Sequence, residues 1–399
     1  MPTESTLFLA GLLFLAAALG YFFARFGGDD DEGELPPQGS TLNADYIKGL
    51  NYLLNEQPDQ ALEVFMRMVE VDDETLETHF ALGSLFRRRG EVDRAIRVHQ
   101  NIIARPNLSA MHREHALVSL AEDYLSAGLF DRAEKLFLEL RESAEYKVRA
   151  LRKLVRIYEI THDWGQAIEV FRELEKADAD LEPTGQISHY HCELAEHAVQ
   201  DRDFPKAREL LKKAGSDRYG TVRARLMLGD LARQTGDHKD AVKIYRSVMD
   251  AESRLIGEMV PRLAESCRGL EDQDLLTTSL NKLRKKDPLA SKAIALAAIH
   301  DDTIQNETAL ECLWDYIADD RILSKLVDIE SVRQRDPAAR SEAITRVRSG
   351  LAALISSTHR YRCNNCGYIT SQLLWQCPSC RQWDTVVPVE QLSLTSPIT

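Results

Sequence analysis

Four of the seven cysteines lie close together near the carboxyl end of the chain, in two Cys-x2-Cys pairs. Cys363 and Cys366 form the first pair, and Cys377 and Cys380 form the second. Such a pair in a tight turn presents two thiolates to one ion, and four thiolates make a closed tetrahedral site for zinc or iron. Gly367, directly after the first pair, suits a turn that needs a positive φ. The spacing therefore predicts one structural metal ion, with zinc preferred and iron possible.

Paired cysteines also form disulfides or a thioredoxin-type redox centre. The redox centre uses a single Cys-x2-Cys beside a βαβ pattern, and no such pattern flanks these pairs. The β-prone residues around them favour short strands instead. We therefore predict a small zinc-ribbon or rubredoxin-like unit over residues 359–390, followed by a loose tail at 391–399, with Trp375 and Trp383 covering the ion on one side.

A unit this small cannot bury enough surface to fold alone, so its metal must supply much of its stability. The rest of the chain must then position it. Three further cysteines, Cys192, Cys267 and Cys312, lie far apart and unpaired in the sequence, which suits a reducing compartment. We expect the metal unit to dock on the rest of the chain or on a partner.

The middle of the chain is repetitive. Segments such as DRAEKLF and WGQAIEVF align on an alanine, and successive alanines lie 34, 38, 34, 40 and 34 residues apart. Tetratricopeptide repeats have this 34-residue period, and each consists of two helices that stack on the next pair. The aligned alanines are Ala61, Ala95, Ala133, Ala167, Ala207 and Ala241. The chain is therefore predicted to be mainly α, with tetratricopeptide repeats over 42–286 and a degenerate repeat and helical connection over 287–358.

The amino-terminal segment from Leu7 to Ala24 carries no charged residue. As a helix it would be about 27 Å long, close to the thickness of a bilayer core. A cleaved signal peptide is the alternative, because Ala16 and Ala18 make an Ala-x-Ala site, but no basic residue precedes the apolar run. We predict a retained transmembrane anchor over 1–26 and an acidic linker over 27–41. Arg25 favours a body on the cytoplasmic side.

Charge and motifs exclude several classes of function. The chain has 50 Lys plus Arg against 63 Asp plus Glu, a net charge of -13, which repels nucleic acid at long range. The sequence contains no phosphate-binding loop, dinucleotide fingerprint, zinc-protease motif or nucleophile elbow, so we predict a non-enzymatic binding protein. The alternative of a zinc-ribbon nucleic-acid binder would use Arg360, Arg362 and Arg381 as a small basic patch, and an iron-thiolate redox protein is a further alternative.

Two other clusters are candidate sites. Arg149, Arg152 and Arg156 form a basic stripe on the first helix of one repeat, which lines the groove of such an array and could receive carboxylates of a bound partner. The alternative is a solvated helix face. The segment SHYHCELAEH offers possible metal ligands, but only some of them share a helix face, so an ordinary helix is favoured. Those residues are His189, His191, Cys192 and His197.

The chain resembles the lipopolysaccharide assembly protein B family over nearly its whole length. The most specific pieces are LGSLFRRRGEVDRAIRVHQ at 82–100, CELA at 192–195, and RYRCNNCG and WQCPSCRQW around the cysteines. The resemblance implies an inner-membrane adaptor that restrains lipopolysaccharide synthesis by promoting degradation of the lipid A pathway deacetylase by the membrane AAA protease. It also implies contacts with other inner-membrane proteins of the lipopolysaccharide pathway. Self-association is left open.

Two departures from known patterns bear on this resemblance. Arg25 is followed by acidic residues, where the family has a stronger basic flank after the anchor. Arg381 stands where rubredoxin usually has glycine, and the ten residues between the cysteine pairs make a shorter gap than in rubredoxin. The second departure argues against electron transfer.

Overall fold

The computed structural model describes residues 73–389 except 183, 217–219, 287, 302, 303, 305, 322 and 357–359, together with 47–49, 51, 52, 57, 60, 61, 63 and 64. The chain divides into two compact units, residues 1–104 and residues 105–399. The predicted anchor, acidic linker and carboxyl-terminal tail lie outside the described residues. In the described part of the chain, no helix combines the length and the apolar character needed to cross a membrane.

The first unit contains one fully described helical hairpin, α4 (Asp73–Arg88) and α5 (Val92–Ile103). Ala95 of α5 is fully buried. A Cβ atom added at Gly83 of α4 would lie 2.5 Å from the ring of His99, so the helices cross where α4 has no side chain. This close approach explains why the repeat places a small residue twelve positions before its aligned alanine.

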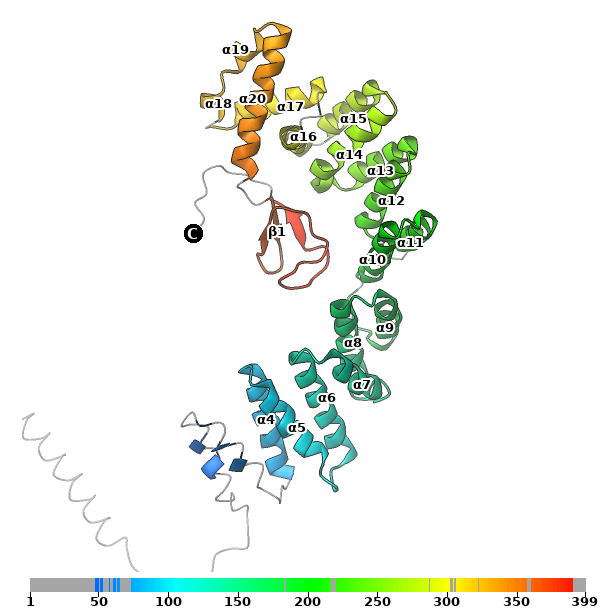
Figure 1. Cartoon of the computed structure of the whole chain (residues 1–399), viewed down its shortest axis with the longest axis vertical. Helices are drawn as coiled ribbons and strands as arrows, with labels where there is room; N and C mark the ends of the chain where they lie inside the picture. The colour runs from blue at the N-terminus through cyan, green and yellow to red at the C-terminus, as the bar shows by residue number, and fades with distance from the viewer. Residues whose placement is uncertain are drawn as a thin grey trace, which may run out of the picture. The chain divides into compact units, whose positions relative to one another are not determined.

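The second unit contains six more helical hairpins that follow one another along the chain (Figure 1). Each hairpin packs on the next, as in tetratricopeptide arrays, so the predicted architecture is confirmed. The pairs are α6 (Ala110–Ser126) with α7 (Phe130–Leu140), α8 (Lys147–Thr161) with α9 (Trp164–Ala177), α10 (Gln186–Gln200) with α11 (Phe204–Ser216), α12 (Val222–Gln234) with α13 (His238–Ala251), α14 (Ile256–Gly269) with α15 (Gln273–Lys286), and α16 (Pro288–His300) with α17 (Glu307–Asp319). A short 3-10 turn, η1 (Ser253–Leu255), precedes α14.

The aligned alanines hold the hairpins together. All six, and Ala309 of the degenerate repeat, have no exposed surface. The large side chain four residues later packs on the small residue of the first helix: a Cβ at Gly229 would lie 2.5 Å from a ring carbon of Tyr245. The 34-residue period of the sequence therefore arises from contacts between the paired helices, in addition to helical propensity.

Turns between the paired helices use residues with left-handed backbone. Gly128 and Gly236 have φ of 73° and 82°, and the next residue donates its backbone N–H to a carbonyl five residues earlier in each case. Glycine adopts this conformation without strain and satisfies the last carbonyls of the helix. The turns set the antiparallel packing of α6 on α7 and of α12 on α13.

Three helices lead from the array to the cysteine unit: α18 (Leu323–Leu326), α19 (Ile329–Arg333) and α20 (Pro337–Ser356). Helix α20 packs against α16, and Ile344 and Leu351 join Ile299 and Trp314 in one hydrophobic cluster. The predicted helical connection is therefore helical and packed on the last hairpin.

The cysteine unit has three short strands, β1 (Tyr361–Cys363), β2 (Ile369–Thr370) and β3 (Val386–Pro388). They form one antiparallel sheet in the order β2-β1-β3, with Tyr361 opposite Thr370 and Cys363 opposite Val386. The predicted small β unit is confirmed, and we call residues 360–389 the ribbon.

Candidate metal centre and its seat on the helical array

The two cysteine pairs form two turns with the same hydrogen-bond pattern. In the first turn, Gly367 donates its N–H to the carbonyl of Cys363 (2.9 Å), and Cys363 donates to the carbonyl of Tyr368 (2.7 Å). In the second, Arg381 donates to Cys377 (2.7 Å) and Cys377 donates to Gln382 (3.0 Å). The five-residue sequences CNNCG and CPSCR thus build equivalent knuckles that aim both thiols of each pair inward.

A positive φ is required at the end of each knuckle. Gly367 has φ of 77°, as the sequence predicted. Arg381 occupies the equivalent position with φ of 56°. A residue with a Cβ atom pays a strain energy in this region that glycine avoids. The departure from the rubredoxin pattern therefore changes the side chain and leaves the backbone turn in place.

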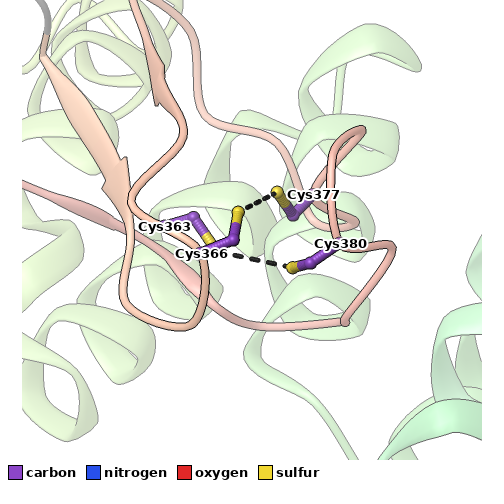
Figure 2. A group of neighbouring side chains, drawn as sticks. All are labelled: Cys363, Cys366, Cys377 and Cys380. Atoms are coloured by element: carbon purple, nitrogen blue, oxygen red, sulfur yellow. Dashed lines mark hydrogen bonds between the residues drawn. The ribbon is translucent and has the colours of Figure 1, made fainter.

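The four sulfur atoms converge (Figure 2). All lie within 4.8 Å of one another, with Cys363 Sγ 3.7 Å from Cys380 Sγ and Cys366 Sγ 3.6 Å from Cys377 Sγ. A tetrahedral site with metal–sulfur bonds of about 2.3 Å has sulfur–sulfur edges of roughly 3.8 Å. The donor set therefore fits one tetrahedral ion with no position left for a substrate.

The surroundings of the thiols differ. Burial raises the pKa of Cys363, but hydrogen bonds with the Thr385 hydroxyl and the backbone N–H groups of the knuckle outweigh it and lower the pKa to about 6. Burial raises the pKa of Cys377 to about 11. The knuckle amides are oriented to stabilise thiolates, which are the metal-binding form of cysteine.

One edge of the ribbon rests on helices α8 and α10. The indole Nε1 of Trp383 donates to Glu159 Oε1 at 2.9 Å, and Tyr190 donates its hydroxyl to the same oxygen at 2.8 Å. Glu159 is 7% exposed. A buried carboxylate needs such donors, because leaving it without them costs several kcal/mol or so. The array and the ribbon therefore each supply one hydrogen-bond donor to the Glu159 carboxylate.

His189 of α10 supports the same tryptophan. Its ring stacks on Trp383 with centroids 4.6 Å apart and an interplanar angle of 19°. Its Nε2 atom lies 2.8 Å from Asp384 Oδ2. The side chain of His189 has no exposed surface, whereas half of the Asp384 side chain is exposed. The histidine thus contacts two consecutive ribbon residues and lies under the ribbon.

A buried cation completes this contact from α12. Arg223 is 2% exposed, and its guanidinium carbon lies 5.9 Å from the centre of the Trp383 ring. Its charge is balanced by Glu193 (2.8 Å) and Glu196 (2.9 Å) of α10. Burial lowers the pKa of Arg223, but these two carboxylates outweigh burial and raise it. Arg223 therefore remains charged beneath the aromatic ring.

The other edge of the ribbon contacts α14. Tyr361 donates its hydroxyl to Glu258 Oε1, and Arg360 lies 3.7 Å from the same oxygen. Leu373 and Trp375 pack against the hydrophobic cluster built by α12 to α17. Together these contacts seat the ribbon on the first helices of four successive hairpins, α8, α10, α12 and α14. We call this the first-helix face.

The predicted basic stripe lies on α8. Arg149 pairs with Glu122 of α6 at 2.7 Å, and Arg152 pairs with Asp178 at 2.5 Å. Arg156 is half-buried, and burial and the nearby Arg381 lower its pKa. Two of the three guanidinium groups thus have carboxylate partners within the chain, and a role in binding a partner stays a prediction.

His189 and Cys192 of the histidine cluster are buried side chains of α10. Within the described residues, the four ribbon cysteines form the group of Cys, His, Asp or Glu whose ligand atoms converge, and it includes none of the residues of SHYHCELAEH. His189 stacks on the ribbon, and Cys192 is buried with a pKa raised to about 12 by burial. Of the small basic patch predicted on the ribbon, Arg360 faces the array and pairs with Glu258.

Sequence reasoning missed the residues that seat the ribbon. It assigned Trp375 and Trp383 to the ion, whereas both pack toward the array; that they also cover the ion stays a prediction. Glu159, Tyr190 and Glu258 were not singled out. Two sequence signals could have found them. One is a glutamate at a position of a first helix that should be buried, and the other is a run of aromatic and histidine residues at such positions.

Comparison with known proteins agrees with this architecture. Residues 361–388 match the rubredoxin metal binding domain family, and residues 78–110, 118–182 and 192–252 match tetratricopeptide repeat families. Among solved structures, the C-terminal part of a TPR repeat-containing protein from Cytophaga hutchinsonii is 14% identical, with a TM-score of 0.35, and the match covers 63% of this chain and 100% of that one.

Two curated relatives match almost from end to end. Lipopolysaccharide assembly protein B of Escherichia coli (strain K12) is 32% identical over 388 residues, which cover 96% of this chain and 97% of that protein. The protein of the same name from Haemophilus influenzae is 31% identical over 392 residues, covering 95% and 97%. With the helical array, the ribbon and all four cysteines in the same chain, the protein belongs to the lipopolysaccharide assembly protein B family.

Proposed function

We propose that this protein acts in lipopolysaccharide assembly as a non-catalytic adaptor held at the inner membrane. The name of the curated relatives supports the pathway, and the tetratricopeptide array supports a protein-binding role. In this proposal the adaptor presents the lipid A pathway deacetylase to the membrane AAA protease and so restrains lipopolysaccharide synthesis. Other inner-membrane proteins of the pathway are its further partners.

The observation that carries the adaptor proposal is the seating of the ribbon on four successive first helices. Buried contacts at both edges, Trp383 with Glu159 and Tyr361 with Glu258, hold the ribbon against the array. The ribbon in turn exposes Ile369 of its edge strand β2 and the preceding residue, Tyr368. An edge strand with exposed apolar side chains is suited to contact a partner chain. A partner would therefore meet a composite surface of ribbon and helices.

The proposed arrangement in the cell follows the sequence. Residues 1–26 form the membrane anchor, 27–41 the linker, 42–286 the repeats, 287–358 the degenerate repeat and connection, and 359–390 the metal unit, with the body on the cytoplasmic side. Arg149, Arg152 and Arg156 would contact carboxylates of a partner, and Arg149 and Arg152 would release their carboxylates within the chain to do so. Nucleic acid is not proposed as a partner, because the chain has a net charge of -13.

The ion is proposed to be zinc in a structural role. Four thiolates fit zinc and iron alike, and the departures from the rubredoxin pattern at Arg381 and in the gap between the cysteine pairs favour zinc. Metal analysis of the purified full-length chain should find one zinc per chain in a colourless protein. A red protein with one iron per chain and a reversible potential would favour the redox alternative.

The adaptor proposal is tested by the half-life of the deacetylase in cells. We expect turnover to be several-fold faster with the wild-type protein than without it, and Cys363→Ser to lose this effect. Ser379→Ala is the matched control, because Ser379 is an exposed knuckle residue that is not a candidate ligand. An equal half-life with and without the wild-type protein would refute the adaptor role and leave a scaffold whose partner must be found by crosslinking.

A further inference from the structure

A cavity of about 620 Å³ lies between the last hairpin and α20, away from the cysteine centre. Figure 1 shows α20 beside α16 and α17, and α20 packs on α16. The volume lies in the range of small-molecule sites, roughly 300–1,000 Å³. The lining comes from the end of α16, from α17, from α20 and from the segment just before α20.

One face of α20 supplies most of this lining. The lining positions 340, 341, 344, 345, 348, 349 and 352 recur at helical spacing, so they form a single stripe along the helix. The stripe alternates guanidinium, hydroxyl and apolar groups. Ile344 and Ile299 are buried and give the cavity an apolar floor, while Ser341 and Thr345 are exposed and give it hydroxyl groups at the rim.

The charge of the lining is one-sided. It contains three arginines and one histidine and no acidic side chain, in a chain whose net charge is -13. Arg348 is engaged as a cap: its guanidinium donates to the carbonyl of Ala298 in the last turn of α16 (2.7 Å) and to that of Ile304 in the loop that follows (3.2 Å). Its hydrogen bonds therefore hold the wall of the cavity.

The other two arginines are available for a ligand. In the described part of the chain, no carboxylate pairs with Arg335 or Arg340. The nearest acidic residues along the helix are occupied elsewhere. Asp336 accepts from the N–H groups of Ala338 and Ala339, and Glu342 pairs with Arg346 at 2.5 Å. An anion in this cavity would therefore lie among guanidinium, hydroxyl and imidazole groups, with no carboxylate in the lining.

We propose that this cavity binds an anionic amphiphile, a phosphate monoester carrying an apolar chain. Guanidinium groups bind phosphate oxygens in pairs of parallel hydrogen bonds, the hydroxyl group of Ser341 adds a donor, and the floor of Ile299 and Ile344 takes the chain. The shared chemistry is that of a membrane lipid with a phosphate headgroup and of a soluble phosphate ester. The inference does not depend on the proposed adaptor function.

The test titrates hexyl phosphate into the full-length protein held in nanodiscs of phosphatidylcholine, with binding measured by calorimetry. We expect hexyl phosphate to bind at least about tenfold more tightly than inorganic phosphate or hexanol, because each lacks one half of the recognised chemistry. Arg340→Gln should weaken binding by about tenfold or more, the usual worth of a charge-assisted hydrogen bond. Arg348 is left intact because it holds the end of α16.

The matched control is Arg346→Gln, which removes a guanidinium from the same helix at a position outside the cavity lining. Its affinity should equal that of the wild type. Equal affinity in Arg340→Gln and wild type, or inorganic phosphate binding as tightly as hexyl phosphate, would overturn the proposal. Nanodiscs that contain phosphatidic acid then identify the source: competition with hexyl phosphate assigns the site to a membrane lipid, and no competition assigns it to a soluble ester.

Discussion

The indole N–H of Trp383 and the carboxylate of Glu159 meet at 2.9 Å although the two residues are 224 positions apart in the chain. The bond joins the loop after the second cysteine knuckle to the first helix of a hairpin near the middle of the array. Since Tyr190 donates to the same oxygen, the carboxylate is shared by two helices and the ribbon. The metal centre is thereby coupled to helix packing through one buried charge.

Removing the donor from this bond should loosen the ribbon. Trp383→Phe keeps an aromatic ring over His189 but deprives Glu159 of one of two donors, and a hydrogen bond to a charged group is worth about 1.5–3 kcal/mol. We expect backbone hydrogen exchange in residues 361–388 to accelerate by about tenfold or more. Tyr368→Phe, on the exposed edge of the ribbon, should leave exchange unchanged; equally fast exchange in both variants would show that the bond does not hold the ribbon.

Loss of one thiol should unfold the ribbon and spare the array. Cys363→Ser breaks the four-thiolate set, and a unit of this size depends on its metal for folding. Far-UV circular dichroism should remain nearly that of the wild type, because the helices have their own core, whereas the near-UV signal of Trp375 and Trp383 should fall. Retention of bound metal and of the near-UV signal by this variant would contradict a structural four-cysteine site.

Adding a methyl group where two helices cross should destabilise the array. Gly229→Ala places a Cβ atom 2.5 Å from the Tyr245 ring, and overpacking of this kind costs about 1–3 kcal/mol. Gly215→Ala is the control, since a Cβ there meets nothing within 4 Å. In thermal unfolding the first variant should melt several degrees lower than the wild type, and the second at the same temperature or higher. A reversed order would refute the packing explanation of the repeat.

Alkaline pH should weaken the contact between Tyr361 and Glu258. Burial and the neighbouring carboxylate raise the pKa of Tyr361 above its unfolded value of about 10. A group whose pKa is raised on folding contributes stability that is full below the unfolded pKa and declines as the pH rises above it. Urea unfolding from pH 8 to 11.5 should therefore show a flatter decline in Tyr361→Phe than in the wild type. Parallel curves would mean that Tyr361 ionises freely in the folded state.

The repeats could be predicted from the sequence because their signal is local. Ala133 and Ala167 recur because each hairpin buries the same position, and this contact spans a dozen residues or so. The knuckles could be predicted for the same reason: Cys363 and Gly367 form one turn whose hydrogen bonds stay within six residues.

The contacts that hold the ribbon on the array could not be predicted in this way. The partners of three array residues lie 103 to 224 residues further along the chain; these residues are Glu159, His189 and Glu258. The local sequence around them does not indicate which residues they contact. The sequence predicts that the stripe of Arg149, Arg152 and Arg156 is either a surface for carboxylates of a partner or a solvated helix face. The carboxylate partners of the first two in this structure, Glu122 and Asp178, belong to neighbouring segments of the array, which only the packing of hairpins brings near.

The contacts between the ribbon and the array affect the order in which the chain folds during synthesis. A plain array of hairpins can fold one pair after another, because each contacts only its neighbours. Here the buried Glu159 and His189 can meet Trp383 and Asp384 only after 224 and 195 further residues have been synthesised. The ribbon must have been synthesised, and must have acquired its metal, before the central helices reach their final environment. In a truncated or metal-depleted chain, the part of the first-helix face that the ribbon covers would therefore remain exposed to solvent.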